Sequence, residues 1–214
     1  MKDYLKSLYN SIGRSYPRTV AVGSYNEETI KYIKKFKPKS IAEIGVYKGH
    51  TTKEIIKVID EDTKLFLFDF EDRLEVLGKE LKELGFNNFE SYSNTYKYLD
   101  SYNSSLNDLW SKKKKPIFDY IFLDGAHTFP IDGLTFFISD FLLKEGGYID
   151  FDDYDWSLKS SPVLNPKVFP LTKKLYSDEQ INEKGVKLII KNYVELSGKY
   201  KTVVKNKIYK KIKT

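Results

Sequence analysis

Short apolar segments alternate along this chain with segments that have helical spacing of apolar positions. Strands of continuous or alternating apolar character are predicted at residues 40–44, 64–70, 88–93, 118–124, 147–152, 201–204 and 207–212. Helices are predicted between them at residues 26–36, 51–59, 73–85, 96–110 and 131–143. Strands that alternate with helices form parallel sheets. The pattern predicts an α/β fold with a doubly wound, mostly parallel seven-stranded sheet, closed by an antiparallel C-terminal hairpin that turns at Asn206.

Two serines precede predicted helices. Ser24 with Glu27, and Ser177 with Gln180, have the spacing of a capping box, in which the two side chains cap each other's backbone amides. The second serine therefore predicts a further helix, which we expect to continue without a break to residue 196.

The length of 214 residues fits a single domain, covering residues 1–214. Four parts are expected along it: an N-terminal extension (1–24), a ligand-binding core (25–156), a loop or lid (157–176), and a helix followed by the terminal hairpin (177–214). The loop is predicted from its three prolines, which exclude a regular helix or a central strand: Pro162, Pro166 and Pro170.

The formal charge of +6 is concentrated in one segment. Residues 199–214 contain seven lysines and no acid, so the rest of the chain carries 6 − 7 = −1. Nucleic-acid binding is not implied by this distribution. Lysines on an edge strand prevent strand pairing between molecules; contact with a lipid or polyanion is the alternative for this tail.

Several classes of protein are excluded by composition. The chain has no cysteine, so disulfides, thiolate metal sites and cysteine nucleophiles are absent. No stretch has the 18 or more apolar residues of a membrane span, and the first residues lack the apolar block of a signal peptide. We expect a cytoplasmic protein without stable membrane insertion.

Polar side chains follow the fourth and fifth predicted strands. Asp124 and His127 come at the end of the fourth, and Asp152 and Asp153 at the end of the fifth. Parallel strands place their carboxyl ends on one edge of the sheet, where open α/β folds bind ligands. Three carboxylates and an imidazole there suit a divalent cation with a base beside it. Strand termination and helix capping are the structural alternatives for each aspartate, and His50 is assigned a structural role.

The turn after the first strand, EIGVYKG, combines an acid with two glycines. Gly45 and Gly49 allow close backbone approach to a ligand, but the GxGxxG pattern of dinucleotide sites is missing. Glu43 would occupy the place of a phosphate and favours a cationic amino-acid group instead. Asp69, which ends the second strand, suits the two hydroxyls of a ribose, or a helix N-terminus. Asn94 suits a purine edge, or a turn.

The motifs EIGVYKG, LFLFD, FDYIFLDGAH and LLKEGGYIDFDDY together resemble class I S-adenosylmethionine-dependent methyltransferases. The most similar type is that of the metal-dependent O-methyltransferases that act on macrolide sugars. The resemblance covers roughly residues 25–156, which it makes the cofactor-binding core, and it implies the Rossmann-like methyltransferase fold.

The resemblance also implies roles for individual residues. Glu43, Gly45 and Gly49 would line the methionine end of the cofactor, and Asp69 would hold its ribose. Asp124, Asp152 and Asp153 match metal-binding positions, with Asp124 also catalytic, and His127 matches the proposed base.

The predicted function is metal-assisted transfer of a methyl group from S-adenosyl-L-methionine to a hydroxyl of a sugar or another small polar acceptor, with magnesium as the expected ion. Metal-independent methylation of a nitrogen or a phosphorus-containing small molecule, and a noncatalytic nucleoside-binding module, are the alternatives. The predicted partner is a small molecule, not a nucleic acid, and a homo-oligomer is left open.

Three residues near the fifth strand remain to be placed. Asp150 falls within the apolar strand and needs a lysine or a tyrosine hydroxyl as partner. Tyr154 and Trp156 follow the acidic pair, and either wall the acceptor pocket or fold back onto the core.

Overall fold

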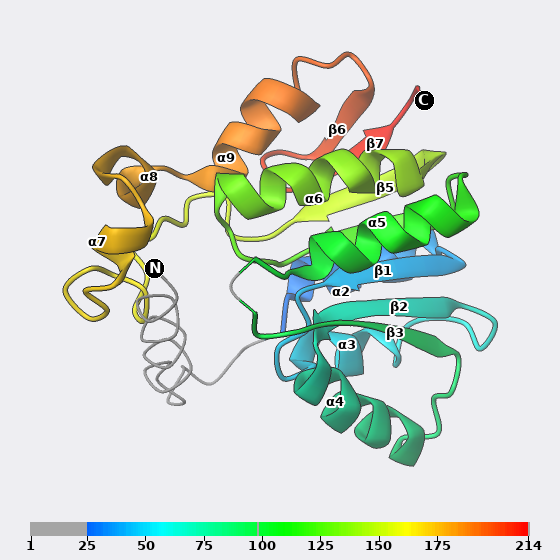
Figure 1. Cartoon of the computed structure of the whole chain (residues 1–214). Helices are drawn as coiled ribbons and strands as arrows, with labels where there is room; N and C mark the ends of the chain where they lie inside the picture. Colours follow the sequence, from blue (N-terminus) through cyan, green and yellow to red (C-terminus); the bar gives the residue numbers. More distant parts are fainter. Residues whose placement is uncertain (1–24, 98, 214) are drawn as a thin grey trace.

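The computed structural model describes residues 25–97 and 99–213. Its sheet has the order β3-β2-β1-β4-β5-β7-β6 (Figure 1). The strands are β1 (Ser40–Ile44), β2 (Lys64–Phe70), β3 (Phe89–Asn94), β4 (Phe118–Leu123), β5 (Leu143–Phe151), β6 (Tyr200–Val204) and β7 (Ile208–Lys211). The first five are parallel, β7 is antiparallel to β5, and β6 is antiparallel to β7. The predicted seven-stranded fold is confirmed.

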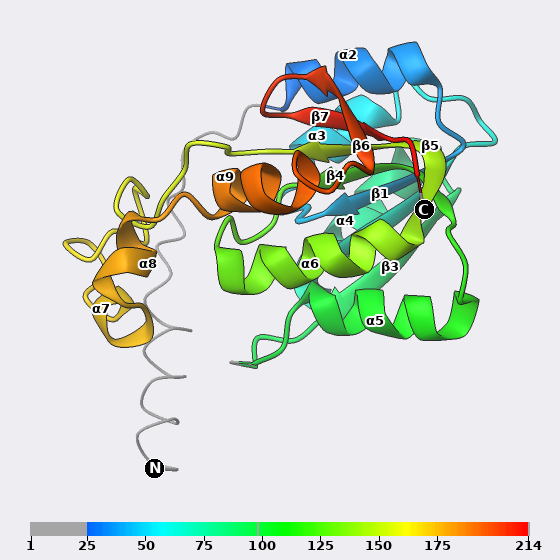
Figure 2. The same ribbon diagram turned by 90° about the horizontal axis from the view of Figure 1, so that it is seen from above.

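Helices cover both faces of the sheet (Figure 2). One face packs against α2 (Glu27–Phe36), α3 (His50–Ile55) and α4 (Glu71–Glu83). The other packs against α5 (Tyr102–Lys113), α6 (Phe129–Leu142), α9 (Gly185–Ile189) and the π-helix η1 (Ile190–Val194). Helix α3 ends at Ile55, where a turn at residues 56–58 follows, and α5 begins at Tyr102; α3 is therefore shorter than predicted and α5 begins later.

Alternation of side chains along the strands supplies both cores. On β1, Ile41 contributes to the core beneath α2 and α4, whereas Ala42 and Ile44 contribute to the core beneath α5 and α6. Successive side chains of a strand point to opposite faces, so a strand buried on both faces must be apolar throughout. The central strands therefore read as continuous apolar runs, and only their carboxyl ends are free to carry polar groups.

The predicted continuous helix over residues 178–196 is wrong. The chain forms α8 (Asp178–Asn182), passes through an extended Glu183, and resumes as α9 and η1. Gly185 explains the break. A Cβ there would lie 2.6 Å from the carbonyl oxygen of His127 and 2.5 Å from the amide nitrogen of Phe129. The backbone therefore leaves the helical path where it packs against the loop after β4.

One of the two predicted capping boxes is confirmed. Ser177 and Gln180 form the predicted capping box of α8. Ser24 lies outside the described residues, and the N-cap of α2 is Asn26, whose side chain accepts a hydrogen bond from the amide of Thr29. The proline-rich part of residues 157–176 contains no helix or strand before the short α7 (Thr172–Leu175).

Asp150 has the partners that its burial requires. Its carboxylate accepts hydrogen bonds from the hydroxyls of Tyr120 (2.6 Å) and Thr29 (2.7 Å) and forms an ion pair with Lys207 (2.9 Å). The predicted lysine or tyrosine partner is confirmed. This cluster ties β4, β5, the turn between β6 and β7, and α2 together.

The basic C-terminal segment is a hairpin, and part of its charge is neutralised. Lys199 and Lys211 form ion pairs with Asp140 of α6, and Lys207 pairs with Asp150. Strand β6 forms the edge of the sheet, where lysines oppose pairing with another strand. Within the described residues, no helix has the length and apolar character needed to cross a bilayer.

Candidate functional site

The carboxyl ends of β1 and β4 meet where the order of strands reverses direction. The amide of Asp124 donates to the carbonyl of Ile44 (2.9 Å), and Gly45 follows directly. A Cβ on Gly45 would lie 1.8 Å from the carbonyl oxygen of Asp124. The glycine-containing turn and the acidic strand end are therefore in contact at the topological switch point, where ligands bind in open α/β sheets.

A buried carboxylate holds the turn after β1. Asp69 accepts hydrogen bonds from the consecutive amides of Val46 (2.8 Å) and Tyr47 (2.6 Å), and from the guanidinium of Arg73 (3.0 Å). Tyr47 has a positive φ of 50°, which is unfavourable for a residue other than glycine. The hydrogen bonds of Asp69 stabilise this loop conformation.

Glu43 and Gly49 lie at either side of the same turn. The Glu43 carboxyl is 2% exposed and accepts a hydrogen bond from the hydroxyl of Thr52 (2.7 Å). Burial raises its pKa to about 8 despite that hydrogen bond, and the charge of Asp69 adds to the effect. Gly49 is the N-cap of α3 and packs closely against Leu77. A buried carboxyl of this kind favours a cationic ligand group that can replace its proton.

Asn94 is the last residue of β3 and pairs in register with Phe70. It is 5% exposed, and its Oδ1 atom has no hydrogen-bond partner within the described part of the chain. The ring of Tyr96, two residues after Asn94, stacks on the ring of Phe70, with centroids 4.0 Å apart. A buried acceptor without a partner costs free energy, which a ligand donor would recover.

The predicted base lies between two of the predicted acids. The Nε2 atom of His127 is 3.7 Å from Oδ1 of Asp124 and 3.4 Å from Oδ2 of Asp153. Burial and then the charges of Asp152 and Asp153 raise the pKa of Asp124 well above its usual range. Burial and Asp152 also raise the pKa of Asp153, although His127 opposes this. Burial is the larger cause of both shifts, and like charges gathered at one sheet edge add to it.

The third predicted acid is directed elsewhere. Asp152 accepts a hydrogen bond from the side chain of Asn26 (2.8 Å) and lies 3.9 Å from Nζ of Lys207. In residues 25–97 and 99–213, no cluster of three or more acidic, histidine or cysteine side chains has the spacing of a metal site. The structure brings Asp124, His127 and Asp153 together and leaves Asp152 beside them.

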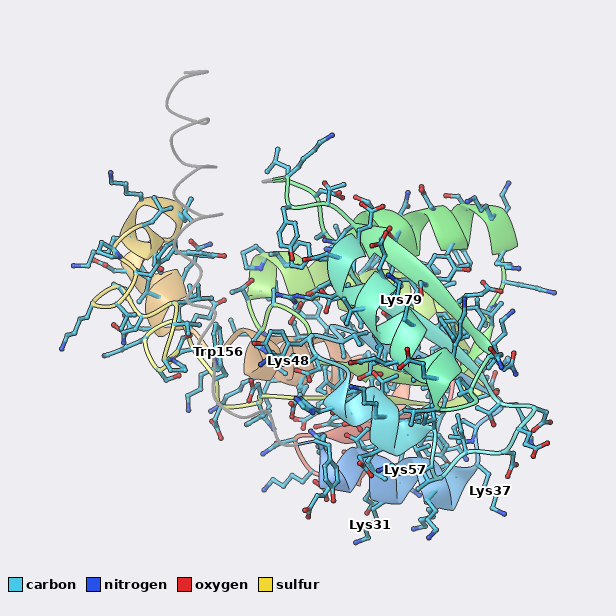
Figure 3. All side chains as sticks on the ribbon, turned by 90° about the horizontal axis from the view of Figure 1, so that it is seen from below. Lys31, Lys37, Lys48, Lys57, Lys79 and Trp156 are labelled. Atoms are coloured by element: carbon cyan, nitrogen blue, oxygen red, sulfur yellow. The ribbon has the colours of Figure 1, made fainter. Side chains whose placement is uncertain are left out.

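The aromatic residues after β5 separate into two roles. The Trp156 ring lies 5.2 Å from the His127 ring, and both line a cavity together with Thr128, Tyr176 and Glu183. Trp156 lies on the side of the molecule that carries the α7–α8 segment (Figure 3). Tyr154 instead packs against the core beneath α9. Trp156 is thus placed as a pocket wall and Tyr154 as core.

Three residues that support the two loops at this sheet edge were missed from the sequence. Asp132 and Tyr102 hold the backbone beside His127, and Arg73 holds Asp69. Arg73 follows Asp69 by four residues at the start of a predicted helix, which is a usable signal for an ion pair. Asp132 and Tyr102 are 30 residues apart, and nothing in the sequence indicates their contact.

Comparison with known families identifies the class. A family profile described as O-methyltransferase matches residues 2–189 of this chain. The chain belongs to this O-methyltransferase family, which confirms the S-adenosylmethionine-dependent methyltransferase expected from its motifs. No curated protein sequence matches at a significant level.

Solved structures share the fold at low sequence identity. A putative caffeoyl-CoA O-methyltransferase from Staphylococcus aureus is 15% identical, with TM-score 0.58 over 97% of this chain and 96% of that one. The methyltransferase PaMTH1 of Podospora anserina, bound to SAH, is 18% identical, with TM-score 0.59 over 98% and 87%. A putative rRNA methylase from Clostridium thermocellum is 13% identical, with TM-score 0.59 over 91% and 99%. Because these names differ in acceptor, the fold does not select one.

Proposed function

We propose that this methyltransferase transfers the methyl group of S-adenosylmethionine to a hydroxyl of a small polar acceptor, with a sugar as the first choice and with assistance from a divalent cation. The observation that carries the proposal is the position of His127. Its Nε2 lies within 3.7 Å of Asp124 and 3.4 Å of Asp153, at the sheet edge that also carries the Glu43–Gly49 turn.

The cofactor is assigned to the turn after β1 and to the ends of β2 and β3. Glu43 would accept the amino group of the methionine end, since its buried carboxyl has no cationic partner within the described residues. Gly45 and Gly49 would line that end of the site. Asp69 would have to exchange existing partners to accept the ribose hydroxyls, since its two oxygens already accept four hydrogen bonds from the loop amides, the Phe70 amide and Arg73. The unpaired Oδ1 of Asn94 would accept from the adenine amino group.

The protein's part in the chemistry is positioning and proton removal. Methyl transfer is an in-line displacement at the carbon bound to sulfur, so the acceptor oxygen must be held about 3 Å from the methyl group. A neutral hydroxyl is a weak nucleophile, and His127 would take its proton near neutral pH. Asp124 and Asp153 would hold the imidazole in place and stabilise its protonated form.

The residues present fit a divalent cation in chemistry and only partly in arrangement. Asp124, Asp152 and Asp153 offer the oxygen ligands that Mg²⁺ prefers. Burial first, and then the charges of Asp152 and Asp153, raise the pKa of Asp124, and a cation would offset both effects. Asp152, however, is held by Asn26 and would have to exchange this partner for the ion. When bound, a divalent cation would orient the acceptor hydroxyl and lower its pKa.

The groups that line the cavity beside His127 suit a small hydroxylated acceptor, but the cavity itself measures only about 10 Å³, so an acceptor ring would have to bind at its open side or displace part of the lining. The Trp156 ring offers an apolar face, and the Thr128 hydroxyl is buried without a partner within the described residues. Burial raises the pKa of Glu183 at the cavity wall. Aromatic faces and hydrogen-bonding groups together suit a ring that carries hydroxyls. A nucleic-acid acceptor is not proposed, since the net positive charge is confined to the terminal segment, where Lys199, Lys207 and Lys211 pair with aspartates.

The full chain incubated with methyl-labelled S-adenosylmethionine tests the proposal. Methyl α-glucoside and 3,4-dihydroxybenzoate serve as hydroxyl probes, and ethanolamine and phosphate as nitrogen and phosphorus probes. We expect label in a hydroxyl probe, dependent on Mg²⁺ and lost in His127→Ala. Label only in ethanolamine or phosphate, insensitive to chelator, would support the metal-independent alternative, which is favoured by the lack of a preformed three-ligand cluster in residues 25–97 and 99–213. Binding of S-adenosylhomocysteine without transfer to any probe would support a noncatalytic nucleoside-binding module.

A further inference from the structure

His127 has a backbone conformation that its own residue type does not favour. Its φ is 57°, in the left-handed region, where residues other than glycine are uncommon. Such a conformation persists only where the surroundings impose it, and it is concentrated at functional sites. The loop after β4 must therefore contain groups that hold His127 in place.

Asp132, in the first turn of α6, supplies that constraint. Its side chain is fully buried, and Oδ2 accepts a hydrogen bond from the amide of His127 (2.7 Å). Oδ1 accepts from the amide of Ala126 (3.2 Å) and from the hydroxyl of Tyr102 (2.5 Å). The Tyr102 oxygen in turn accepts from the same Ala126 amide (2.7 Å). All three groups that contact the Asp132 carboxylate are donors, which is the arrangement that a carboxylate requires.

The loop is enclosed from two further directions. A Cβ on Gly125 would lie 2.1 Å from the Tyr102 hydroxyl and 2.8 Å from Oδ1 of Asp132, so only glycine permits this approach. On the other side, Gly185 of α9 packs against the His127 carbonyl. The imidazole Nδ1 has no hydrogen-bond partner within the described residues, and Nε2 lies no closer than 3.4 Å to the carboxylates beside it. The backbone contacts therefore contribute to setting where the ring lies.

The turn after β1 is held in the same way. Asp69 accepts from the consecutive amides of Val46 and Tyr47, and Tyr47 also has a positive φ. Both loops at this sheet edge thus use a buried aspartate that accepts two consecutive amides, the second belonging to a left-handed residue. In one loop Arg73 supports the aspartate, and in the other Tyr102 does.

We propose that Asp132 and Tyr102 are positioning residues that hold the His127 loop so that the imidazole faces Asp124 and Asp153. The inference rests on the proposed role of His127 as the base. Neither residue is assigned contact with cofactor or acceptor; they act through the backbone of Ala126 and His127.

Helix α6 provides a matched control. Asp140, eight residues after Asp132, accepts a hydrogen bond from the hydroxyl of Tyr200 (2.6 Å) and pairs with Lys199 and Lys211. It too is an aspartate bonded to a tyrosine, but it is only partly buried and its partners lie in the terminal hairpin. Asp140→Asn and Tyr200→Phe therefore report the structural cost of losing such a pair without touching the loop.

The chain has only two histidines, so the imidazole Cε1–H signals of His127 and His50 can be assigned by NMR with one substitution. We expect Asp132→Asn to shift or split the His127 signal and leave His50 unchanged, and Asp140→Asn to change neither. Tyr102→Phe removes one hydroxyl and is expected to fold and to shift the signal less. With 3,4-dihydroxybenzoate as acceptor, Asp132→Asn should lower kcat about tenfold or more with KM within about twofold, as misplacement of a reacting group does.

Unchanged His127 signals in both Asp132→Asn and Tyr102→Phe, or equal loss of kcat in the Asp132 and Asp140 variants, would overturn the positioning role. Failure of the proposed function gives a different result: wild-type protein would transfer no methyl group to the acceptor, while the NMR comparison would still be decisive for the loop.

Discussion

Gly45 and Asp124 are in backbone contact: a Cβ on the glycine would lie 1.8 Å from the aspartate carbonyl oxygen. The two residues follow neighbouring parallel strands, and their contact joins the turn assigned to the cofactor with the strand end assigned to the acceptor chemistry. The methyl donor and the acceptor must lie within a few ångströms of each other during transfer. The contact between Gly45 and Asp124 brings the two assigned regions that close.

Gly45→Ala is expected to abolish binding of S-adenosylhomocysteine and to destabilise the protein, since the new methyl group would overlap the Asp124 carbonyl and φ is +89°. Gly146→Ala is the matched control, because φ there is +81° and no atom lies within 4 Å of the added Cβ. It should cost only about 1 kcal/mol of backbone strain and leave binding intact. Isothermal titration and thermal unfolding measure both effects. Equal binding by the two variants would contradict the assigned contact.

Binding of the cofactor product should release a proton from Glu43. Burial raises the pKa of Glu43 to about 8, so its carboxyl is mostly protonated at pH 7, whereas a bound amino group requires the carboxylate. Affinity for S-adenosylhomocysteine should therefore rise with pH, by up to about tenfold per unit, until the pH reaches the pKa of the free protein. Calorimetry in buffers of different ionisation enthalpy counts the proton released.

Glu43→Gln is the control for this linkage. The amide keeps a hydrogen bond to Thr52 but cannot ionise, so proton release should disappear and affinity should become nearly independent of pH. Wild-type binding without any uptake or release of protons would remove the amino-group role from Glu43.

Substitution of Asp152, but not of the nearby Asp155, should change the Mg²⁺ concentration that transfer requires. Chelation with EDTA is expected to stop transfer to 3,4-dihydroxybenzoate, and Mg²⁺ to restore it. Asp152→Asn should raise the Mg²⁺ concentration needed for half-maximal rate by about tenfold or more, since it removes a charged oxygen ligand. Asp155→Asn should change little, because Asp155 is exposed and paired with Lys184. Full activity in EDTA would exclude an essential cation.

The ion pairs and hydrogen bonds of Asp140 should make the free energy of unfolding decrease at acidic pH. Burial disfavours ionisation of Asp140, but hydrogen bonds from Tyr200 and Lys199 and the charge of Lys211 outweigh it, so the pKa is lowered. The stabilisation is therefore complete above the unfolded-state pKa of about 3.9 and is lost as pH falls through the lower folded value. Asp140→Asn should cost about 2 kcal/mol or more at pH 7, because Lys211 is buried beside it. Urea unfolding as a function of pH measures this. A difference from wild type that does not shrink below about pH 4 would count against the assignment.

Several features of this protein followed from the sequence because they depend on local pattern. Continuous apolar strands that alternate with helices are typical of a parallel sheet covered on both faces. The positions of Glu43, Asp69, Asn94 and Asp124 at strand ends therefore predicted that they lie on one edge. The burial of Asp150 likewise demanded a cationic or hydroxyl partner, and the structure supplied Lys207 and Tyr120.

Only the tertiary structure decided how the loops at that edge are held. The break between α8 and α9 arises because Gly185 packs against the His127 loop, a contact between segments nearly 60 residues apart. Asp132 of α6 accepts a hydrogen bond from Tyr102 of α5. Asp152 accepts one from Asn26, which lies 126 residues earlier in the chain. Such contacts form between polar groups that are distant in the sequence and become neighbours only when the helices and strands pack together. Local sequence pattern therefore does not predict them.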